Sequence, residues 1–376
     1  MTEKTPSHAR PTPLVRSLPP TVPFVGPEVH ERANDMRFRA RLGANENVFG
    51  PSPKVIAALA EAASEIWKYG DSTSHDLRAV LAAHMDVAPA NIVVGEGIDG
   101  LLGYLVRLMV EPGDAVVTSD GAYPTFNYHV VAHGGVLHKQ PYRDDREDLP
   151  ALIAAAREVG AKLVYYANPD NPMGTWERGQ DIVAHLDDLP EGALLVLDEA
   201  YVELAPEGTA APVAADDPRV IRMRTFSKAY GLAGARIGYA LGEAPLIAQF
   251  EKIRNHFGVN ILAQRAALVA LQDQQWLRGI RDKVVASREG IARIAAENGL
   301  EYVPSATNFV TIDCGRDGEF ARRVLAALVA RGVFVRMPFV APQDRCIRVS
   351  CGAPGDLEIL AEVLPQALAA AQDRGD

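Results

Sequence analysis

Cysteine is scarce in this chain of 376 residues, and the three that occur, Cys314, Cys346 and Cys351, form no CxxC pair. An odd number of cysteines without a pairing motif argues against a disulfide framework and indicates a reducing compartment, so we expect a cytoplasmic protein. The nine histidines are dispersed, with no HExxH motif and no Cys/His cluster. We therefore predict no metal site.

Long hydrophobic runs and clustered positive charge are also missing. No stretch reaches the roughly 20 apolar residues that cross a membrane, and the N-terminal MTEKTPSHARPTPLVRSLPP has no apolar segment of the secretory type. The formal net charge is -10 and the basic residues are scattered, so no positive stripe is available to neutralise nucleic-acid phosphates. We expect neither a membrane nor a nucleic-acid partner.

Length and composition indicate a globular chain of more than one domain. Hydrophobic residues make up 48% and charged residues 23%, and one hydrophobic core rarely serves so long a chain. Residues 1 to about 40 are rich in proline and arginine and lack periodicity, whereas a long helical pattern runs from Ile261 to Asn298. We predict an extended N-terminal arm (1–45), a large domain (46–262) and a smaller α/β domain (263–376).

The large domain alternates short apolar segments with helical ones. Such alternation is typical of an α/β fold with a mostly parallel, doubly wound sheet, in which functional residues follow the carboxyl ends of the strands. The predicted strands are Asn91–Gly95, Asp114–Ser119, Leu163–Ala167, Ala193–Asp198 and Val220–Thr225.

One lysine lies in an unusual setting. Lys228 belongs to TFSKAYGLAGARIGYA (residues 225–240), where most neighbours are small or apolar. Loss of water lowers the pKa of an amine and frees the neutral form that attacks an aldehyde to give an imine. Most single lysines are solvated, so the interpretation depends on what the fold brings near Lys228.

Asp198 is a candidate for the second group of such a site. It ends the apolar segment ALLVLD, and a buried carboxylate is costly unless a cation meets it. The protonated pyridine nitrogen of pyridoxal 5'-phosphate (PLP) is such a cation, and PLP is also an aldehyde. The alternative is that Asp198 caps the next helix.

A phosphate seat is indicated by NIVVGEGIDGLLGYLV, which combines a strand, a glycine turn and a helix start. The amides of Gly97, Ile98 and Asp99 can point at an anion there, although similar turns occur in proteins without ligands. Hydroxyls and a fixed positive charge for the same phosphate can come from Thr225, Ser227 and Arg236.

Other polar residues follow the predicted strands. Asn171, in the turn NPDNPMG, and Tyr201 can reach the phenolic oxygen of PLP, and Tyr123 can stack on its ring. Ordinary packing is the alternative for each tyrosine. Arg348, in the strand-like CIRVS, suits a substrate carboxylate, or it is an exposed strand arginine.

Together these residues resemble the fold-type I PLP enzymes, specifically the class I/II aminotransferases and most closely their histidinol-phosphate aminotransferase branch. The resemblance spans nearly the whole chain and rests on LGANENVFGPSP, on Tyr69 before LRAVLA, and on SKAYGLAGARIGY. Three segments depart from the family pattern: NPMG stands for NPTG, GEGID forms the phosphate turn, and VFVRMPFVAP differs near the side-chain pocket.

The resemblance implies a PLP cofactor and catalytic roles for Lys228, Asp198 and Tyr201. Lys228 would carry PLP as an imine and move the proton, and Tyr69 would reach the cofactor phosphate from the second subunit of a homodimer. The implied ligands of PLP are Gly97, Ile98, Asp99, Tyr123, Asn171, Asp198, Tyr201, Thr225, Ser227, Lys228, Arg236 and Tyr69. The implied substrate contacts are Arg348, Arg336 and Asn47, with Arg336 facing a substrate phosphate, an acidic substrate or solvent.

The predicted activity is transfer of an amino group from a donor, glutamate in the first instance, to a 2-oxo acid or to imidazole acetol phosphate. Two alternatives remain open at this point, and a third is disfavoured. An aromatic amino acid aminotransferase and a PLP-dependent decarboxylase or lyase use the same scaffold. A non-catalytic PLP-binding regulator would lack the lysine, and Lys228 is present.

Overall fold

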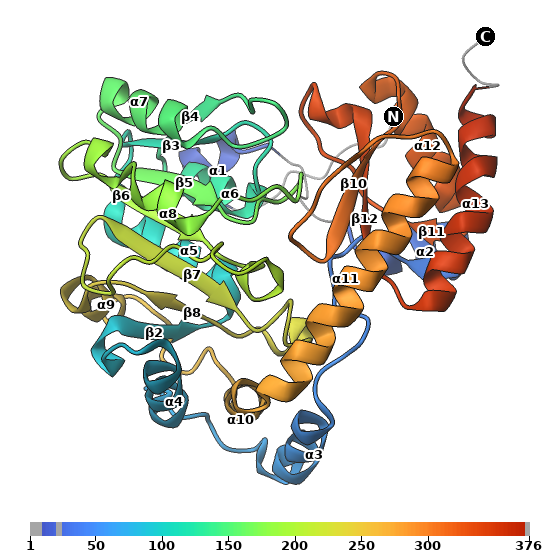
Figure 1. Cartoon of the computed structure of the whole chain (residues 1–376). Coiled ribbons are helices and arrows are strands. Elements are labelled where there is room, and N and C mark those ends of the chain that lie inside the picture. Colours follow the sequence, from blue (N-terminus) through green and yellow to red (C-terminus); the bar gives the residue numbers. More distant parts are fainter. Residues whose placement is uncertain (1–9, 20–24, 373–376) are drawn as a thin grey trace.

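The computed structural model describes residues 10–19 and 25–372. A larger lobe is built on one central sheet, and a smaller lobe contains the C-terminal part of the chain (Figure 1). The long helix α11 (Gln274–Glu297) runs from the base of the large lobe along the small one. The predicted α/β fold is confirmed.

Seven strands form the central sheet, in the order β2-β8-β7-β6-β5-β3-β4. β8 runs antiparallel to both of its neighbours, and the other adjacent pairs are parallel. The bounds in sheet order are β2 (Ile92–Gly95), β8 (Gly238–Leu241), β7 (Val220–Thr225), β6 (Leu194–Asp198), β5 (Leu163–Ala167), β3 (Ala115–Ser119) and β4 (Val136–Gln140).

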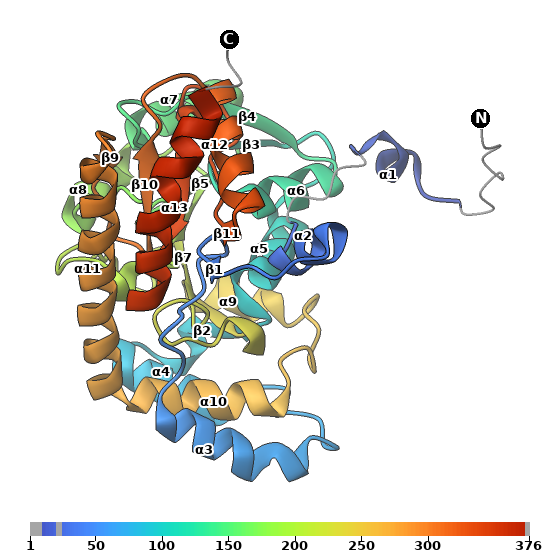
Figure 2. The ribbon, with the colours of Figure 1, turned by 90° about the vertical axis from the view of Figure 1, so that its right-hand side faces the viewer.

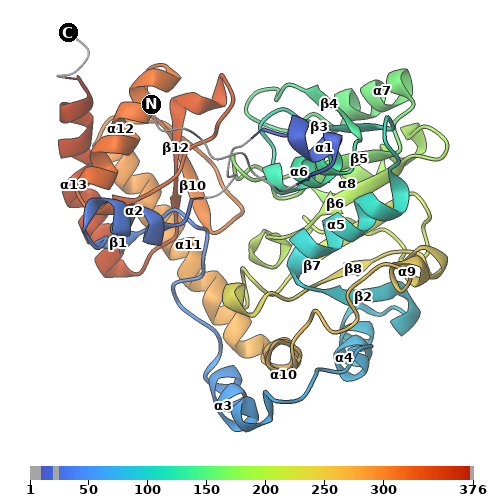
Figure 3. The same ribbon diagram turned by 180° about the vertical axis from the view of Figure 1, so that it is seen from behind.

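Helices cover both faces of this sheet, which explains why its central strands β5, β6 and β7 are buried along their whole length. One face packs against α5 (Gly97–Met109), α6 (Pro124–Ala132) and α9 (Ala244–Phe250), and α5 lies in front of the sheet in Figure 3. The other face packs against α7 (Leu149–Val159) and α8 (Gly179–Val183). The last residues of β5, β6 and β7 are Ala167, Asp198 and Thr225, and all three line one cavity.

A group of helices forms the base of the large lobe (Figure 2). There α10 (Ile261–Gln272) packs on α3 (Pro53–Ala62) and α4 (His75–Met85). The single helical stretch predicted from Ile261 to Asn298 is wrong, because the chain breaks at Asp273. The Asp273 carboxylate accepts hydrogen bonds from Ser52 and Lys54 at the start of α3.

The small lobe contains two small sheets. β9 (Tyr302–Val303), β10 (Phe309–Asp313) and β12 (Cys346–Ser350) form an antiparallel sheet, and β1 (Ala40–Arg41) pairs in parallel with β11 (Val333–Phe334). The remaining helices of this lobe are α12 (Gly318–Ala330) and α13 (Pro354–Gln372).

The N-terminal segment differs from the extended arm that we predicted. Its described residues include two short helices, α1 (Pro13–Ser17) and α2 (Pro27–Asn34). Ion pairs from Arg41 to Glu28 and Glu31 hold α2 against β1, and helices this short leave little periodicity in the sequence.

The domain boundaries at 45/46 and 262/263 stay a proposal. The second of them falls inside α10, since that helix starts at Ile261. Single turns of 3-10 helix lie at η1 (Ala63–Glu65), η2 (Pro89–Asn91), η3 (Leu186–Asp188), η4 (Val202–Leu204), η5 (Ala233–Ala235) and η6 (Gln343–Arg345).

Candidate active site

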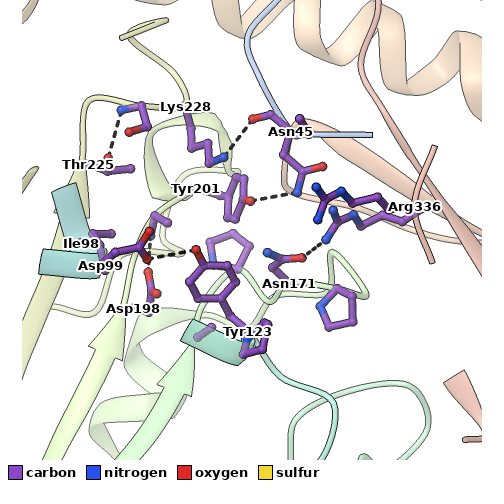
Figure 4. A pocket seen from close by; sticks show the side chains of 18 of the residues that line it. Asn45, Ile98, Asp99, Tyr123, Asn171, Asp198, Tyr201, Thr225, Lys228 and Arg336 are labelled. Carbon is purple, nitrogen blue, oxygen red and sulfur yellow. Dashed lines mark hydrogen bonds between the residues drawn. The ribbon is translucent and has the colours of Figure 1, made fainter. Parts of the chain in front are cut away.

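A cavity of about 440 Å³ opens where the central strands end (Figure 4). Asn171 follows β5, Asp198 ends β6 and Lys228 follows β7, whereas Arg336 and Arg348 come from the small lobe. The predicted site residues that line this cavity are Ile98, Asp99, Tyr123, Asn171, Asp198, Tyr201, Thr225, Ser227, Lys228, Arg236, Arg336 and Arg348.

Lys228 has the environment of a nucleophilic amine. Its Nζ donates a hydrogen bond to the backbone carbonyl of Asn45 at 3.0 Å and lies 5.7 Å from the centre of the Tyr201 ring. Burial, and then repulsion from the Arg348 guanidinium, lower the pKa of Lys228 to about 8. A substantial fraction of the amine is therefore neutral at mildly alkaline pH and able to attack an aldehyde.

Asp198 is a buried carboxylate that faces the cavity. Its Oδ2 accepts a hydrogen bond from the Tyr165 hydroxyl at 2.6 Å, and its Oδ1 accepts one from the amide of Ala200 at 3.0 Å. Burial raises the pKa of Asp198 to about 6, although both hydrogen bonds act in the opposite direction. A cation placed next to it would favour the charged form, so the carboxylate suits a protonated ring nitrogen.

The first turn of α5 and Arg236 form a seat for an anion. Gly97 opens the helix with φ +81°, and a Cβ at this position would lie 2.7 Å from Nη2 of Arg236. Arg236 also donates to Ser227 Oγ at 3.5 Å and lies 3.8 Å from the Asp99 carboxylate. The first amides of a helix have no partner within it, and with a guanidinium nearby they fit a phosphate.

A second anion seat lies across the cavity, where Arg336 and Arg348 exchange backbone hydrogen bonds. Arg348 donates to Asn171 Oδ1 and Gly43 O, and its buried Nε has no hydrogen-bond partner among the described residues. Burial lowers the pKa of Arg348 to about 10. Arg336 donates to the carbonyl of Val25 at 3.0 Å. An anionic substrate group would satisfy the orphaned Nε.

Two tyrosines face the space between these seats (Figure 4). The Tyr123 hydroxyl donates to Asp99 Oδ1 at 3.0 Å, and the Tyr201 hydroxyl accepts a hydrogen bond from Asn45 Nδ2 at 3.1 Å. Burial raises the pKa of Tyr201 to about 12. Both rings are thus held by hydrogen bonds at the wall of the cavity.

The comparison with known families agrees with this geometry. Residues 40–364 match the family model described as aminotransferase class I and II. The chain belongs to this family.

Individual relatives of this class I and II aminotransferase point to one branch. The chain is 34% identical over 363 residues to histidinol-phosphate aminotransferase 2 of Carboxydothermus hydrogenoformans, covering 93% of this chain and 99% of that one. It is 38% identical over 331 residues to histidinol-phosphate aminotransferase of Anaeromyxobacter sp., with 86% and 89% covered.

A solved structure gives the same indication. Histidinol-phosphate aminotransferase from Sinorhizobium meliloti, solved in complex with pyridoxal-5'-phosphate, superposes with a TM-score of 0.94 at 52% identity. The superposition covers 97% of this chain and 99% of that one.

Three predicted site residues lie outside the lining of the aminotransferase cavity. Gly97 does not line the cavity itself, but its lack of a side chain leaves room for the Arg236 guanidinium. Tyr69 is 80% exposed and packs on the Phe257 ring, away from the cavity of its own chain. Asn47 donates a hydrogen bond to the carbonyl of Ala229 and accepts one from the amide of Phe49; it does not line this cavity, so its contact with the substrate stays a prediction.

Asn45, two residues before Asn47, lines the cavity. It is 2% exposed, has φ +54°, and contacts Lys228 and Tyr201 as described above. Ser350 on β12 and Asn308 hold it through further hydrogen bonds. Its segment LGANEN is part of the family signature, but a buried amide in a loop leaves no periodic signal.

The cysteines, the helices and the candidate metal ligands were also compared with the sequence-based expectations. The three cysteines are free and buried. None of the helices in residues 10–19 and 25–372 is both long and apolar enough to cross a membrane. In the same residues, no group of three or more His, Cys, Asp or Glu side chains is arranged to hold a metal ion.

Proposed function

We propose that this protein is a PLP-dependent aminotransferase of the histidinol-phosphate aminotransferase type. It moves an amino group between an amino acid donor, glutamate in the first instance, and a 2-oxo acid or imidazole acetol phosphate. The observation that carries the proposal is the convergence of Lys228, Asp198 and the Gly97–Arg236 anion seat on one cavity of about 440 Å³. The named relatives and the PLP complex of the Sinorhizobium meliloti enzyme support it.

When bound, PLP supplies an aldehyde and an electron-poor ring that withdraws electrons from the substrate Cα. With PLP bound, the neutral Lys228 amine would hold the cofactor through its aldehyde, and the same amine, when free, could accept a proton from the substrate Cα. The Asn45 carbonyl orients this amine. Asp198 would keep the ring nitrogen protonated.

The remaining cofactor contacts follow from the positions of the side chains around the cavity. Asn171 and Tyr201 would contact the phenolic oxygen of PLP and Tyr123 would cover its ring, since all three side chains line the cavity. The phosphate would be held by the first turn of α5, by two hydroxyls and by one guanidinium: Gly97, Ile98, Asp99, Thr225, Ser227 and Arg236.

On the substrate side, Arg348 binds a carboxylate and Arg336 binds a second anionic group. Arg348 offers its free Nε, and a planar guanidinium matches a carboxylate through two parallel hydrogen bonds. Substrate phosphate or a side-chain carboxylate would replace the Val25 carbonyl on Arg336.

An aromatic amino acid aminotransferase is the second candidate function. Phe339 lines the cavity from the small lobe and is 66% exposed, beside Met337 and Pro338. An exposed apolar ring at the mouth of a site can pack on an aromatic side chain of the substrate.

We further propose a cytoplasmic homodimer in which Tyr69 completes the cofactor site of the second subunit. Tyr69 (80% exposed) packs on Phe257 (53%), and Ile66 (67%) and Trp67 (79%), just before it in the chain, are also exposed; we treat these four side chains as one exposed apolar patch. Contiguous apolar patches of this kind mark association sites. The free buried cysteines are consistent with a reducing compartment.

The two candidate functions can be distinguished by comparing kcat/KM for two amino-group acceptors. With glutamate as donor, the first predicts a higher kcat/KM for imidazole acetol phosphate than for phenylpyruvate. Arg336→Gln should lower kcat/KM for the phosphorylated acceptor by on the order of tenfold or more, since it removes a charge-assisted hydrogen bond, and should change phenylpyruvate turnover less. A preference for phenylpyruvate would favour the second candidate.

A further inference from the structure

Tyr165 contacts the Asp198 carboxylate from inside the sheet. It lies on β5, whose register places Ala167 beside Asp198 on β6. The Tyr165 hydroxyl donates to Asp198 Oδ2 at 2.6 Å, and Tyr165 is 0% exposed. No sequence motif singles Tyr165 out, because LVYYA has the pattern of an ordinary buried strand.

The ring of Tyr165 is fixed by its neighbours. Side chains alternate along a strand, so Tyr165 faces α5 and α6 while Val164 and Tyr166 face the opposite layer. Phe126, on α6, stacks on Tyr165 with ring centres 4.7 Å apart and planes 16° apart, and it is 0% exposed. Because both rings are enclosed, the hydroxyl has little freedom to leave Asp198.

We propose that Tyr165, backed by Phe126, is a positioning residue that orients the Asp198 carboxylate toward the cofactor ring and keeps it charged. This inference rests on the proposed function and extends it to a residue behind the cofactor site. The hydroxyl is a donor that stays neutral, since burial raises the pKa of Tyr165 well above its ordinary range. It therefore stabilises the charged form of the carboxylate more than the protonated form.

The charges around Asp198 make this donor important. Burial raises the pKa of Asp198, and the nearby carboxylates Asp99 on α5 and Glu199 next in the chain raise it further. The contacts that oppose these effects are the Tyr165 hydroxyl and the Ala200 amide. Tyr201 also lies within electrostatic range of Asp198, since the Asp198 carboxylate raises the pKa of Tyr201. Without Tyr165, more of Asp198 would be protonated near neutral pH and could not pair with a protonated ring nitrogen.

The test is a titration of the cofactor-depleted protein with PLP from pH 6 to 9, following absorbance, for Tyr165→Phe and for a matched control. Tyr166→Phe is that control, because it removes a buried hydroxyl from the same strand on the opposite face, where it contacts Glu177. Losing a hydrogen bond to a charged group should weaken PLP binding about tenfold. The pH below which affinity falls should also rise in Tyr165→Phe and stay unchanged in Tyr166→Phe.

Two further variants test whether the loss of PLP affinity in Tyr165→Phe comes from the hydrogen bond to Asp198 and not from a general disturbance of the fold. In an Asp198→Asn background, Tyr165→Phe should cause no further loss of PLP affinity, since there is no charge left to stabilise. Phe126→Leu keeps the hydroxyl but frees the ring, and it should move the pH midpoint in the same direction by less. The inference is overturned if Tyr165→Phe leaves affinity and midpoint unchanged, or if its effect persists in the Asp198→Asn background. Absence of PLP binding in the unmodified protein would instead overturn the proposed function.

Discussion

At the scale of single residues, the site combines groups whose pKa values are moved by burial in opposite directions. The pKa of Lys228 falls to about 8, and the pKa of Asp198 rises to about 6. Both shifts favour the uncharged form of the side chain in a cavity that would bind a charged cofactor. The cofactor phosphate and the ring nitrogen would each find a partner of opposite sign.

The Lys228 shift predicts how PLP capture depends on pH. The neutral amine is the attacking form, so the rate at which the cofactor-depleted protein incorporates PLP should rise with pH and level off above about 8. The folded protein also binds fewer protons than the unfolded chain between pH 8 and the ordinary value of 10.5, so this group makes unfolding less favourable as pH rises through that window. Stopped-flow absorbance measures the rate, and a rate that is flat from pH 6.5 to 9 would contradict the environment described for Lys228.

Replacing Lys228 should separate activity from folding. Lys228→Ala should abolish turnover, with a loss of on the order of 10³-fold or more expected for a covalent catalyst, while far-UV circular dichroism stays unchanged. Lys252→Ala, at an exposed position, is the control and should retain activity. Substantial transamination by Lys228→Ala would refute the catalytic assignment.

At the scale of elements, the site depends on where strands end and helices begin. Apolar runs such as LVYYA and ALLVLD predicted the buried parallel strands, and the residues that follow them do converge. β4 was not predicted because it is a polar edge strand, half exposed. β8 was not predicted because this four-residue strand overlaps the end of the glycine-rich lysine segment. Tyr165 could not be recognised, since its partner depends on the register between β5 and β6.

The start of α5 gives a prediction at this scale. Gly97→Ala places a Cβ at positive φ and 2.7 Å from the Arg236 guanidinium. Strain at positive φ costs about 1–2 kcal/mol, and Gly113→Ala, at φ +95° with open space around it, should share that cost. Only Gly97→Ala should also weaken PLP binding, by about tenfold, which corresponds to about 1.4 kcal/mol. Thermal unfolding and PLP titration of both variants test this, and equal PLP affinities would contradict the role of the turn.

At the scale of the whole molecule, the two lobes enclose the cavity, and the N-terminal segment joins them. Asn45 links Lys228 of the large lobe to Ser350 of the small one. The sequence predicted the two-part organisation, but not that residues 40–41 pair with β11. Pairing across nearly 300 residues leaves no local pattern, which is why the arm was expected to be extended.

The proposed dimer predicts a linked loss of assembly and cofactor. Trp67→Ala removes the aromatic centre of the exposed patch and should weaken association by about 2 kcal/mol or more if it is an interface anchor. Sedimentation equilibrium should show that the variant dissociates at a higher protein concentration than the unmodified protein. PLP titration should show weaker binding, because Tyr69 of the second subunit no longer reaches the cofactor site. Tyr302→Ala, at an exposed ring of the small lobe, should leave both unchanged. A monomeric parent protein would refute the dimer.

The central claim is most directly tested by the absorbance spectrum of the purified protein as single amino donors are added without acceptor. Glutamate, histidinol phosphate and phenylalanine would each be added alone. We predict a visible band from lysine-bound PLP that glutamate and histidinol phosphate convert to the pyridoxamine form, with Lys228→Ala unable to give the band of the unmodified protein. A bound cofactor that no donor converts would contradict the aminotransferase assignment, and a protein that never binds PLP would contradict the account as a whole.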